Sequence, residues 1–322
     1  MTWQQTLKNN ITKADELREL LKISRGQEDR MNRILDQFPM TIPKYYFSLI
    51  DWSDPNDPVR KMCVPSIEET DLDGSFDTSG ESDNTILKGL QHKYGATALI
   101  LSTHNCAMYC RHCFRKRLVG LSNEETAPDL DEIGVYIREH KEISNILISG
   151  GDAFLNSNQT IRAYLELLTQ IEHLDLIRFG TRTPVVLPDR ITNDQELLDM
   201  LDTYSNKKTI YVVTQFNHPN ELTPQAVMAV NALIRRGVCV KNQTVLLKGV
   251  NDDPTVLGEL LRGLTRNGII PYYIFQCRPV TGVQNQFQVP LQKGYEIVEG
   301  AKQLQNGQGK CIRYVIDRKS VV

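Results

Sequence analysis

Residues Cys106–Cys113 read CAMYCRHC and place three cysteines in a C-x3-C-x2-C pattern, soon after the apolar run Ala98–Leu101. Three thiolates this close in sequence can hold one inorganic group only if the loop folds around it. Thiolates are the soft ligands that bind iron–sulfur clusters and zinc. Because no fourth cysteine follows nearby, a four-iron cluster bound here keeps one iron available to a ligand that the protein does not supply. We therefore predict a [4Fe–4S] cluster on Cys106, Cys110 and Cys113.

Two other interpretations of these cysteines need no cluster. Zinc can take His104 or His112 as a fourth ligand, but structural zinc sites usually pair two short knuckles, and no second knuckle follows here. Alternatively, the thiols are free and buried as small apolar groups. The spacing favours the cluster over both. We expect buried, unreactive thiols at the remaining cysteines, which are Cys63, Cys239, Cys277 and Cys311.

The composition sets the broad class of the protein. The chain has 322 residues and a formal net charge of −2, so it can bury a large core and lacks the basic character of many nucleic-acid-binding proteins. The basic run Arg111–Arg117 shares its loop with the cysteines, and we interpret it as an anion pocket. No apolar run approaches the roughly 18 residues of a membrane helix, and no export signal is visible at the start. We expect a cytoplasmic protein with no nucleic-acid or membrane partner.

Short apolar runs alternate with helical patterns from Thr97 onward. Thr223-Pro224 and Asp253-Pro254 predict two helix starts, and Gly237 and Gly268 predict the corresponding ends. Strands alternating with helices predict an α/β fold with a parallel sheet. Six such units are too few for a closed eight-stranded barrel, so we predict a partial (β/α)6 TIM-type barrel that is open along one side. The expected strands are Ala98–Ser102, Asn145–Ser149, Leu176–Gly180, Thr209–Thr214, Val238–Val245 and Ile270–Gln276.

Three parts are expected along the chain. Residues 1–90 predict an N-terminal helical and irregular extension, in which the acidic stretch 70–84 is interpreted as a surface strap. Residues 91–300 hold the partial barrel. Residues 301–322 form a C-terminal segment.

Candidate functional side chains follow the ends of the predicted strands. In barrels of this type, reactive groups gather at the carboxyl ends of the strands. The cysteine loop follows the first strand, Gly150–Asp152 the second, Arg182 the third and His218 the fourth, while Gln243 lies near the end of the fifth. We expect these residues to line one shared, cofactor-binding site.

The stretch Cys106–Arg117, CAMYCRHCFRKR, resembles the signature of the radical S-adenosylmethionine (SAM) superfamily, in the version carried by the lysine 2,3-aminomutase family. The resemblance covers most of the chain in family order, but the C-terminal zinc-binding and tetramerisation segment has no counterpart, so this is a short form. The other matching stretches are Pro39–Arg60, His92–Tyr94, Ser149–Asp152, Arg182–Pro188, Phe216–Glu221, Asn242–Leu247 and Pro271–Tyr273.

The resemblance implies how the cluster and the substrate are used. The amine and carboxylate of SAM chelate the open iron, and Gly150, Gly151 and Asp152 receive this end of SAM. One electron then splits the carbon–sulfur bond and leaves a 5′-deoxyadenosyl radical, which removes the β-hydrogen of an amino acid before the amino group migrates. Arg115 stands at the family's position for the arginine that holds the substrate carboxylate, a task that suits a bidentate guanidinium.

The resemblance also implies pyridoxal 5′-phosphate (PLP). Lys93 and Tyr94 match residues that help hold its phosphate, with Lys93 replacing an arginine. Gln243 matches a residue near the ring or the phosphate, and Thr97 stands where the family has another arginine.

The family's covalent PLP lysine follows a glycine run near the C-terminus. Gly307–Lys310, GQGK, offers Lys310 as that residue, and Lys319 is a weaker alternative. A surface turn with a solvated lysine is the competing interpretation of the same stretch.

The chain departs from the lysine enzymes at their two side-chain-binding aspartates. Arg278 stands in place of the first, and Leu304–Asn306 occupies the space of the second. These changes favour an acidic substrate side chain, such as that of glutamate, over lysine. Asp253 replaces an upstream zinc cysteine, so no zinc is expected.

Together these observations predict a radical SAM, PLP-dependent 2,3-aminomutase, an isomerase that moves the α-amino group of an L-amino acid to the β-carbon. A reductant such as flavodoxin or ferredoxin is its expected partner, and a homodimer is left open. One alternative keeps the cluster and SAM but performs PLP-independent chemistry on another substrate. The other alternative is a non-catalytic zinc-binding protein.

Overall fold

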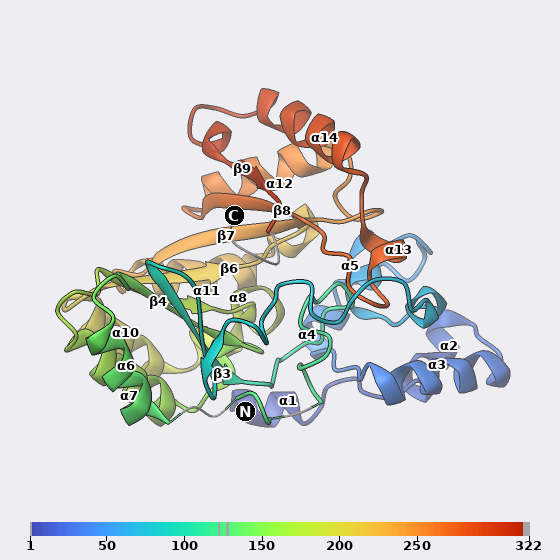
Figure 1. Ribbon diagram of the computed structural model, residues 1–322. Coiled ribbons are helices and arrows are strands. Elements are labelled where there is room, and N and C mark those ends of the chain that lie inside the picture. The colour runs from blue at the N-terminus through green and yellow to red at the C-terminus, as the bar shows by residue number, and fades with distance from the viewer. Residues whose placement is uncertain (1, 122, 127–128, 318–322) are drawn as a thin grey trace.

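The computed structural model describes residues 2–121, 123–126 and 129–317, and in it nine strands form one sheet whose order follows the chain (Figure 1). The strands from β3 to β9 are all parallel to one another. β2 pairs with β3 in the antiparallel direction, and β1 pairs with β2 in the same way. β1 and β9 are the two ends of this order, so the barrel is open. The strands are β1 (Thr85–Leu87), β2 (Leu90–Tyr94), β3 (Thr97–Thr103), β4 (Asn145–Gly150), β5 (Leu176–Gly180), β6 (Thr209–Thr214), β7 (Cys239–Leu246), β8 (Ile270–Gln276) and β9 (Arg313–Val315).

The predicted α/β class and partial barrel are confirmed, and all six expected strands are present within one or two residues. The sequence pattern missed β1, β2 and β9. β1 and β9 have three residues each, too few to show a period of two. β2 extends past residue 90 and β9 lies beyond residue 300, so the sheet continues across both expected part boundaries.

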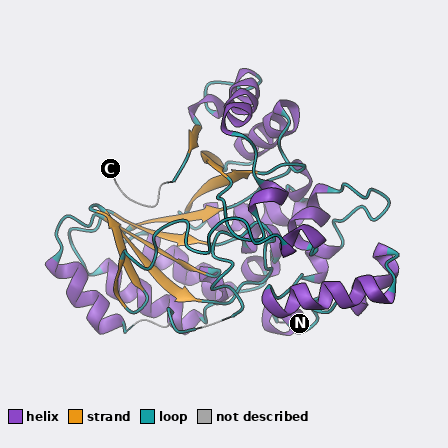
Figure 2. Cartoon of the chain, turned by 45° about the vertical axis from the view of Figure 1, so that its right-hand side comes forward, coloured by secondary structure: helices purple, strands orange, loops and turns teal. Residues whose placement is uncertain are grey.

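Helices cover the outer face of the strands (Figure 2). The predicted starts at Thr223 and Asp253 are confirmed, because each side chain accepts a hydrogen bond from the first turn of its helix. No described helix is long and apolar enough to span a membrane. The helices after the strands are α6 (Leu130–Glu139), α7 (Asn158–Thr169), α8 (Thr183–Val186), α9 (Asp189–Thr192), α10 (Gln195–Ser205), α11 (Pro224–Ile234), α12 (Pro254–Arg266), α13 (Gln284–Phe287) and α14 (Leu291–Gln303).

The N-terminal extension packs against the cysteine loop. The fully buried Arg111 donates to the carbonyls of Phe38 (3.2 Å) and Pro39 (2.9 Å) and pairs with the buried Glu69. These contacts make the extension part of the wall around the cysteines. Its elements are α1 (Trp3–Leu7), α2 (Arg18–Leu21), α3 (Arg25–Gln37), α4 (Lys44–Phe47), α5 (Pro58–Cys63) and the 3-10 helices η1 (Asp15–Leu17) and η2 (Ile67–Thr70); three further 3-10 turns are η3 (Ala153–Leu155), η4 (Pro219–Glu221) and η5 (Gly309–Cys311).

Candidate functional site

The three cysteines lie in the loop after β3, at the carboxyl end of the sheet. Burial, followed by the nearby Asp152, Cys113 and Cys110, raises the pKa of the Cys106 thiol well above its usual value. Burial, with Cys110 second, raises the pKa of the Cys113 thiol to about 12. The mutual electrostatic influence shows that the three thiols face the same space. Protonated thiols of this kind lose their protons when a metal binds.

The thiols are not drawn together around a single ion. No three His, Cys, Asp or Glu side chains among the described residues come close enough to hold one metal ion. A cubane cluster holds its cysteines on different iron atoms, whereas zinc draws its ligands to about 2.3 Å from one centre. The choice between a cluster and zinc rests on the cysteine spacing, which has no second knuckle.

Arg182 links the cysteine loop to the ends of β5 and β6. Its Nη1 donates to the Sγ of Cys110 at 2.9 Å, and its Nε donates to the Gln215 carbonyl at 3.0 Å. Its Nη2 pairs with Glu221 and lies 3.3 Å from the Tyr46 hydroxyl. Arg182 therefore lies beside the cysteine loop, and its predicted contact with a cofactor stays a prediction; no sequence pattern indicated that it contacts a sulfur atom.

His218 is oriented differently from the prediction. Its Nδ1 accepts a hydrogen bond from the Asn220 amide at 3.2 Å and thereby caps η4. Burial lowers the pKa of His218, which favours the neutral ring that this cap requires. The side chain is therefore used locally, and contact with a cofactor stays a prediction.

Gly150 and Gly151 bring the end of β4 against the cysteine loop. Gly150 has φ +112°, and the Gly151 amide donates to the Thr103 carbonyl at 2.6 Å. A Cβ on Gly151 would lie 2.3 Å from the Asn105 carbonyl oxygen. The two glycines thus permit the close backbone approach that was predicted, but the structure places protein backbone there.

Both carboxylate oxygens of Asp152 are already used within the protein. Oδ1 accepts from the Thr181 hydroxyl at 2.6 Å and the Phe154 amide at 3.0 Å, and Oδ2 accepts from the Arg182 amide at 2.6 Å. Asp152 therefore connects β4 to β5 and positions Arg182. Oδ2 accepts this one hydrogen bond and keeps a second lone pair, so a contact between Asp152 and the amine of SAM stays a prediction.

Arg115 is buried beside the cysteine loop and has one acidic partner. Its Nε donates to Glu81 at 2.7 Å, and its Nη1 donates to the Ser149 hydroxyl and the Gly150 carbonyl, both at 3.2 Å. Glu81 also pairs with Arg117 at 2.9 Å. Glu81 lies in the acidic strap, in which the sequence analysis found no candidate functional residue. The acidic composition of the strap and the basic composition of the cysteine loop could have predicted this ion pair.

Lys93, Tyr94 and Arg278 converge on one carboxylate, that of Asp317. The Tyr94 hydroxyl donates to Asp317 Oδ1 at 2.8 Å, Lys93 Nζ lies 3.4 Å from the same oxygen, and Arg278 pairs with Oδ2. Ser79 accepts from both cations, through its carbonyl and its hydroxyl. Lys93, Tyr94 and Arg278 thus share one internal carboxylate, and their predicted contacts with phosphate and substrate stay predictions.

Lys310 is exposed and lies in η5, three residues before β9. β9 is parallel to β8 and begins opposite Tyr273, midway along β8, whereas the cysteine loop and Arg278 follow the carboxyl ends of β3 and β8. The role of Lys310 as the covalent PLP lysine stays a prediction, and Lys319 lies outside the described residues. Gln243 is half-buried on β7, paired in register with Tyr273.

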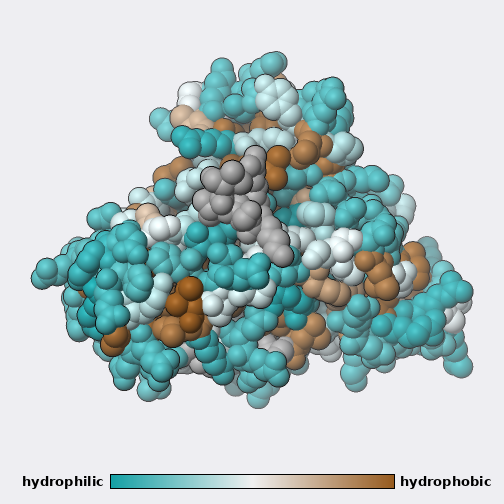
Figure 3. Space-filling model, in the orientation of Figure 1, coloured by the Kyte–Doolittle hydropathy of each residue, from teal (hydrophilic) through white to brown (hydrophobic). Residues whose placement is uncertain are grey.

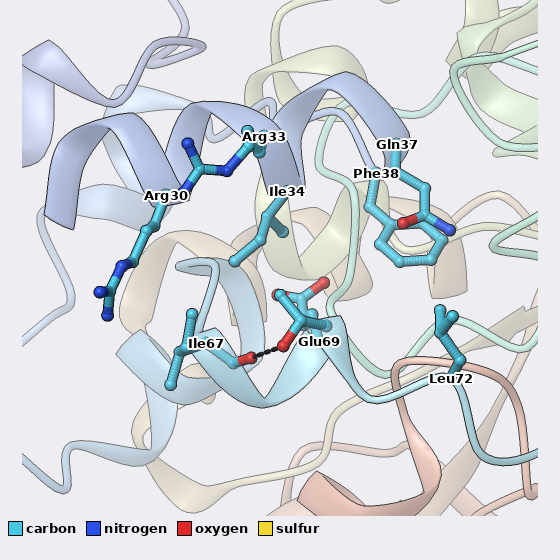
Figure 4. Close-up of a pocket in the computed structure, with 9 residues that line it drawn as sticks. Arg30, Arg33, Ile34, Gln37, Phe38, Ile67, Glu69 and Leu72 are labelled. Atoms are coloured by element: carbon cyan, nitrogen blue, oxygen red, sulfur yellow. Dashed lines mark hydrogen bonds between the residues drawn. The ribbon is translucent and has the colours of Figure 1, made fainter. Parts of the chain in front are cut away.

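A separate hollow of about 480 Å³ lies between α3 and η2 (Figure 4). Its wall includes Glu69, which binds Arg111 and Lys116 of the cysteine loop. Phe38 separates it from a second hollow of about 10 Å³ beside Cys110 and Cys113, which has room for about one water molecule. The visible face of the molecule is mainly hydrophilic (Figure 3).

The comparisons with known proteins agree with this geometry. The model of the radical SAM superfamily matches residues 100–257. A putative L-lysine 2,3-aminomutase from Aquifex aeolicus is 41% identical over 92% of this chain and 79% of its own length. An L-lysine 2,3-aminomutase from Clostridium subterminale is 38% identical over 98% of this chain and 75% of its own. The chain belongs to the lysine 2,3-aminomutase family of radical SAM enzymes.

Membership in this family makes the protein an isomerase and excludes the alternative of a non-catalytic zinc-binding protein. The family also contains a glutamate 2,3-aminomutase from Clostridioides difficile, 36% identical over 92% of this chain and 69% of its own length. A radical SAM enzyme uses a [4Fe–4S] cluster and SAM, which together supply an organic radical when the cluster is reduced. Cys106, Cys110 and Cys113 fit the cluster, since three half-buried cysteines lie in one loop and Arg182 donates to one of them.

The fit of this aminomutase to PLP is incomplete. Lys93 and Tyr94 offer a cation and a hydroxyl to one anion, as a phosphate group requires. Thr97 is hydrogen-bonded to Asn145 at 3.0 Å and adds no charge. Lys310 is exposed in η5, and its role as the covalent lysine stays a prediction.

Proposed function

We propose that this aminomutase moves the α-amino group of a free L-amino acid to its β-carbon, with Arg115 binding the α-carboxylate. The orientation of Arg115 carries the proposal. Its Nε and Nη1 are held by Glu81, Ser149 and Gly150, while its Nη2 has no hydrogen bond to any residue that the structure describes. A buried guanidinium fixed on one side can offer its other side to a carboxylate next to the cysteine loop.

The charges around Asp317 support glutamate as the substrate in preference to lysine. Arg278 and Lys93 contact a single carboxylate there, so these three groups carry a net charge of +1. An acidic side chain on Arg278 is attracted by this charge, whereas a lysine ammonium is repelled. Coulomb energies between partly buried charges near contact are a few kcal/mol, which is enough to select between the two.

We include PLP in the proposal on one condition, which concerns Asp317. If Asp317 releases its partners, Arg278 can hold the substrate side chain while Lys93 and Tyr94 hold the phosphate. Lys310 is the candidate for the covalent lysine. We also propose a low-potential donor such as flavodoxin or ferredoxin as the reductant, and a cytoplasmic location.

Thr97, which stands in place of a phosphate-binding arginine, favours a second candidate function, a PLP-independent radical reaction of the same family. Anaerobic protein loaded with iron, sulfide and PLP separates the two. Under the first proposal an absorbance band of bound PLP forms and is lost in Lys310→Ala, and borohydride fixes PLP to a lysine that peptide mapping identifies. Absence of both band and adduct supports the PLP-independent candidate.

The substrate is tested by incubating the reduced, SAM-loaded enzyme with L-glutamate, L-lysine and the other protein amino acids and analysing β-amino isomers. We expect β-glutamate, and we expect Arg115→Lys to raise KM far more than the control Arg162→Lys, an exposed residue on α7. Turnover of lysine without glutamate would contradict the charge argument. SAM cleavage without any β-isomer would overturn the aminomutase reaction itself.

A further inference from the structure

Arg182 makes a contact to the cysteine loop that the radical reaction itself does not require. Its guanidinium Nη1 lies 2.9 Å from the Sγ of Cys110. Lys116 also lies near the loop, but its ammonium pairs with Glu69 at 2.5 Å. Arg115 similarly pairs with Glu81. Within the described residues, Arg182 is thus the side-chain cation with a hydrogen bond directly to a thiol of the loop.

The protein holds this guanidinium rigidly. Arg182 is 8% exposed, and Tyr46 and Glu221, which contact its Nη2, are fully buried. Glu221 is itself fixed, because its other oxygen accepts from the amides of Asn217 (2.6 Å) and His218 (3.1 Å). The Arg182 amide is bound by Asp152. A side chain restrained at both ends keeps its donor directed at the sulfur when the thiol becomes a cluster ligand.

We infer that Arg182 raises the reduction potential of the [4Fe–4S] cluster through its hydrogen bond to Cys110. Reduction adds one electron from an external low-potential donor and takes the cluster from the 2+ to the 1+ state, with no proton transferred by Arg182. The added negative charge is stabilised by a nearby cation and by a donor to a ligating sulfur. Both effects are strong at a buried site because the local dielectric constant is low. Arg182 is therefore a positioning residue that makes the cluster easier to reduce.

The inference rests on the cluster that belongs to the family and is independent of the proposed substrate. Its test is a redox titration of the reconstituted protein without substrate or PLP, monitored by the electron paramagnetic resonance signal of the reduced cluster. Arg182→Gln removes the charge, and Arg182→Lys keeps the charge with a shorter reach. Arg190→Lys is the matched control, since Arg190 is fully buried and donates to Phe154 and Asn158.

We expect a more negative potential in Arg182→Gln, by at least a tenfold change in the equilibrium of reduction, equivalent to about 59 mV for one electron. Arg182→Lys should fall between this variant and the native protein, and Arg190→Lys should match the native potential even if its melting temperature falls. Iron and sulfide content is measured in each sample. Native potentials in both Arg182 variants would overturn the inference. If Arg182→Gln does not fold or does not take up the cluster, the potential of Arg182→Lys decides. If Arg182→Lys folds but takes up no cluster, the residue serves cluster assembly, and this result also overturns the inference.

Discussion

The hydroxyl of Tyr94 donates a hydrogen bond to Asp317 at 2.8 Å across 223 positions of the sequence. Tyr94 ends β2, near one edge of the sheet, and Asp317 follows β9, at the other edge. The contact therefore spans the open side of the barrel. It also places an internal carboxylate where an anionic ligand is expected.

Replacing Asp317 by Asn should strengthen anion binding. The change removes one negative charge that contacts Lys93 and Arg278, so inorganic phosphate should bind several-fold more tightly, as measured by calorimetry on the cluster-loaded protein. Asp73→Asn is the control, because this carboxylate accepts only a 3.3 Å hydrogen bond from the exposed Asn285. Equal phosphate affinity in both variants would show that Asp317 does not occupy an anion site.

Glu81→Gln should destabilise the protein and weaken substrate binding. The substitution removes the acidic partner of two cations, Arg115 and Arg117, of which Arg115 is deeply buried. Breaking a buried pair from one side costs about 3–5 kcal/mol, so the urea midpoint should drop clearly. KM for the amino acid should rise more than kcat falls, since Arg115 loses the contact that orients its guanidinium. A variant with native KM would separate Glu81 from substrate binding.

Gly151→Ala should impair cluster loading. The new Cβ would lie 2.3 Å from the Asn105 carbonyl, so the cysteine loop must shift, and iron content after reconstitution should decrease. Gly26→Ala on α3 meets nothing within 4 Å and should leave iron content unchanged while stabilising the helix by up to about 1 kcal/mol. Full iron content in Gly151→Ala would show that the loop tolerates the displacement.

The strap should loosen in acid. Burial tends to raise the pKa of Asp77, but hydrogen bonds from the Glu81 amide and from the amide and hydroxyl of Ser82 lower it to about 2. A carboxyl with a depressed folded-state pKa stabilises the fold above its unfolded value near 4, and this contribution is lost as the pH falls from about 4 to 2. Hydrogen exchange of the Glu81 and Ser82 amides should therefore increase over that range beyond the change expected from intrinsic rates. In Asp77→Asn this extra pH dependence should be absent.

The barrel and the location of the site followed from local patterns. Strand runs such as Leu176–Gly180 and caps such as Thr223 are encoded by neighbouring residues, and parallel strands bring their carboxyl ends together. This was sufficient to place Arg182 beside the cysteines.

The partners inside the site could not be predicted in the same way. The ion pairs of Glu81 with Arg115 and of Asp317 with Arg278 span 34 and 39 positions, and nothing local specifies them. The place of Lys310 relative to the site was equally unpredictable, because it depends on the three-residue strand that follows, and that strand has no readable period.

The fully buried guanidinium of Arg111 has a consequence for the cooperativity of the molecule. It directly follows the cysteine at position 110 and is bound by the carbonyls at positions 38 and 39. A proteolytic cut in that segment would disturb two acceptors of a positive charge inside the protein, next to the iron-binding loop, and would leave this charge to its ion pair with Glu69. The amino-terminal extension and the metal-binding loop should accordingly unfold as one unit, so that limited digestion near residue 39 releases iron at the same rate as it cleaves the chain.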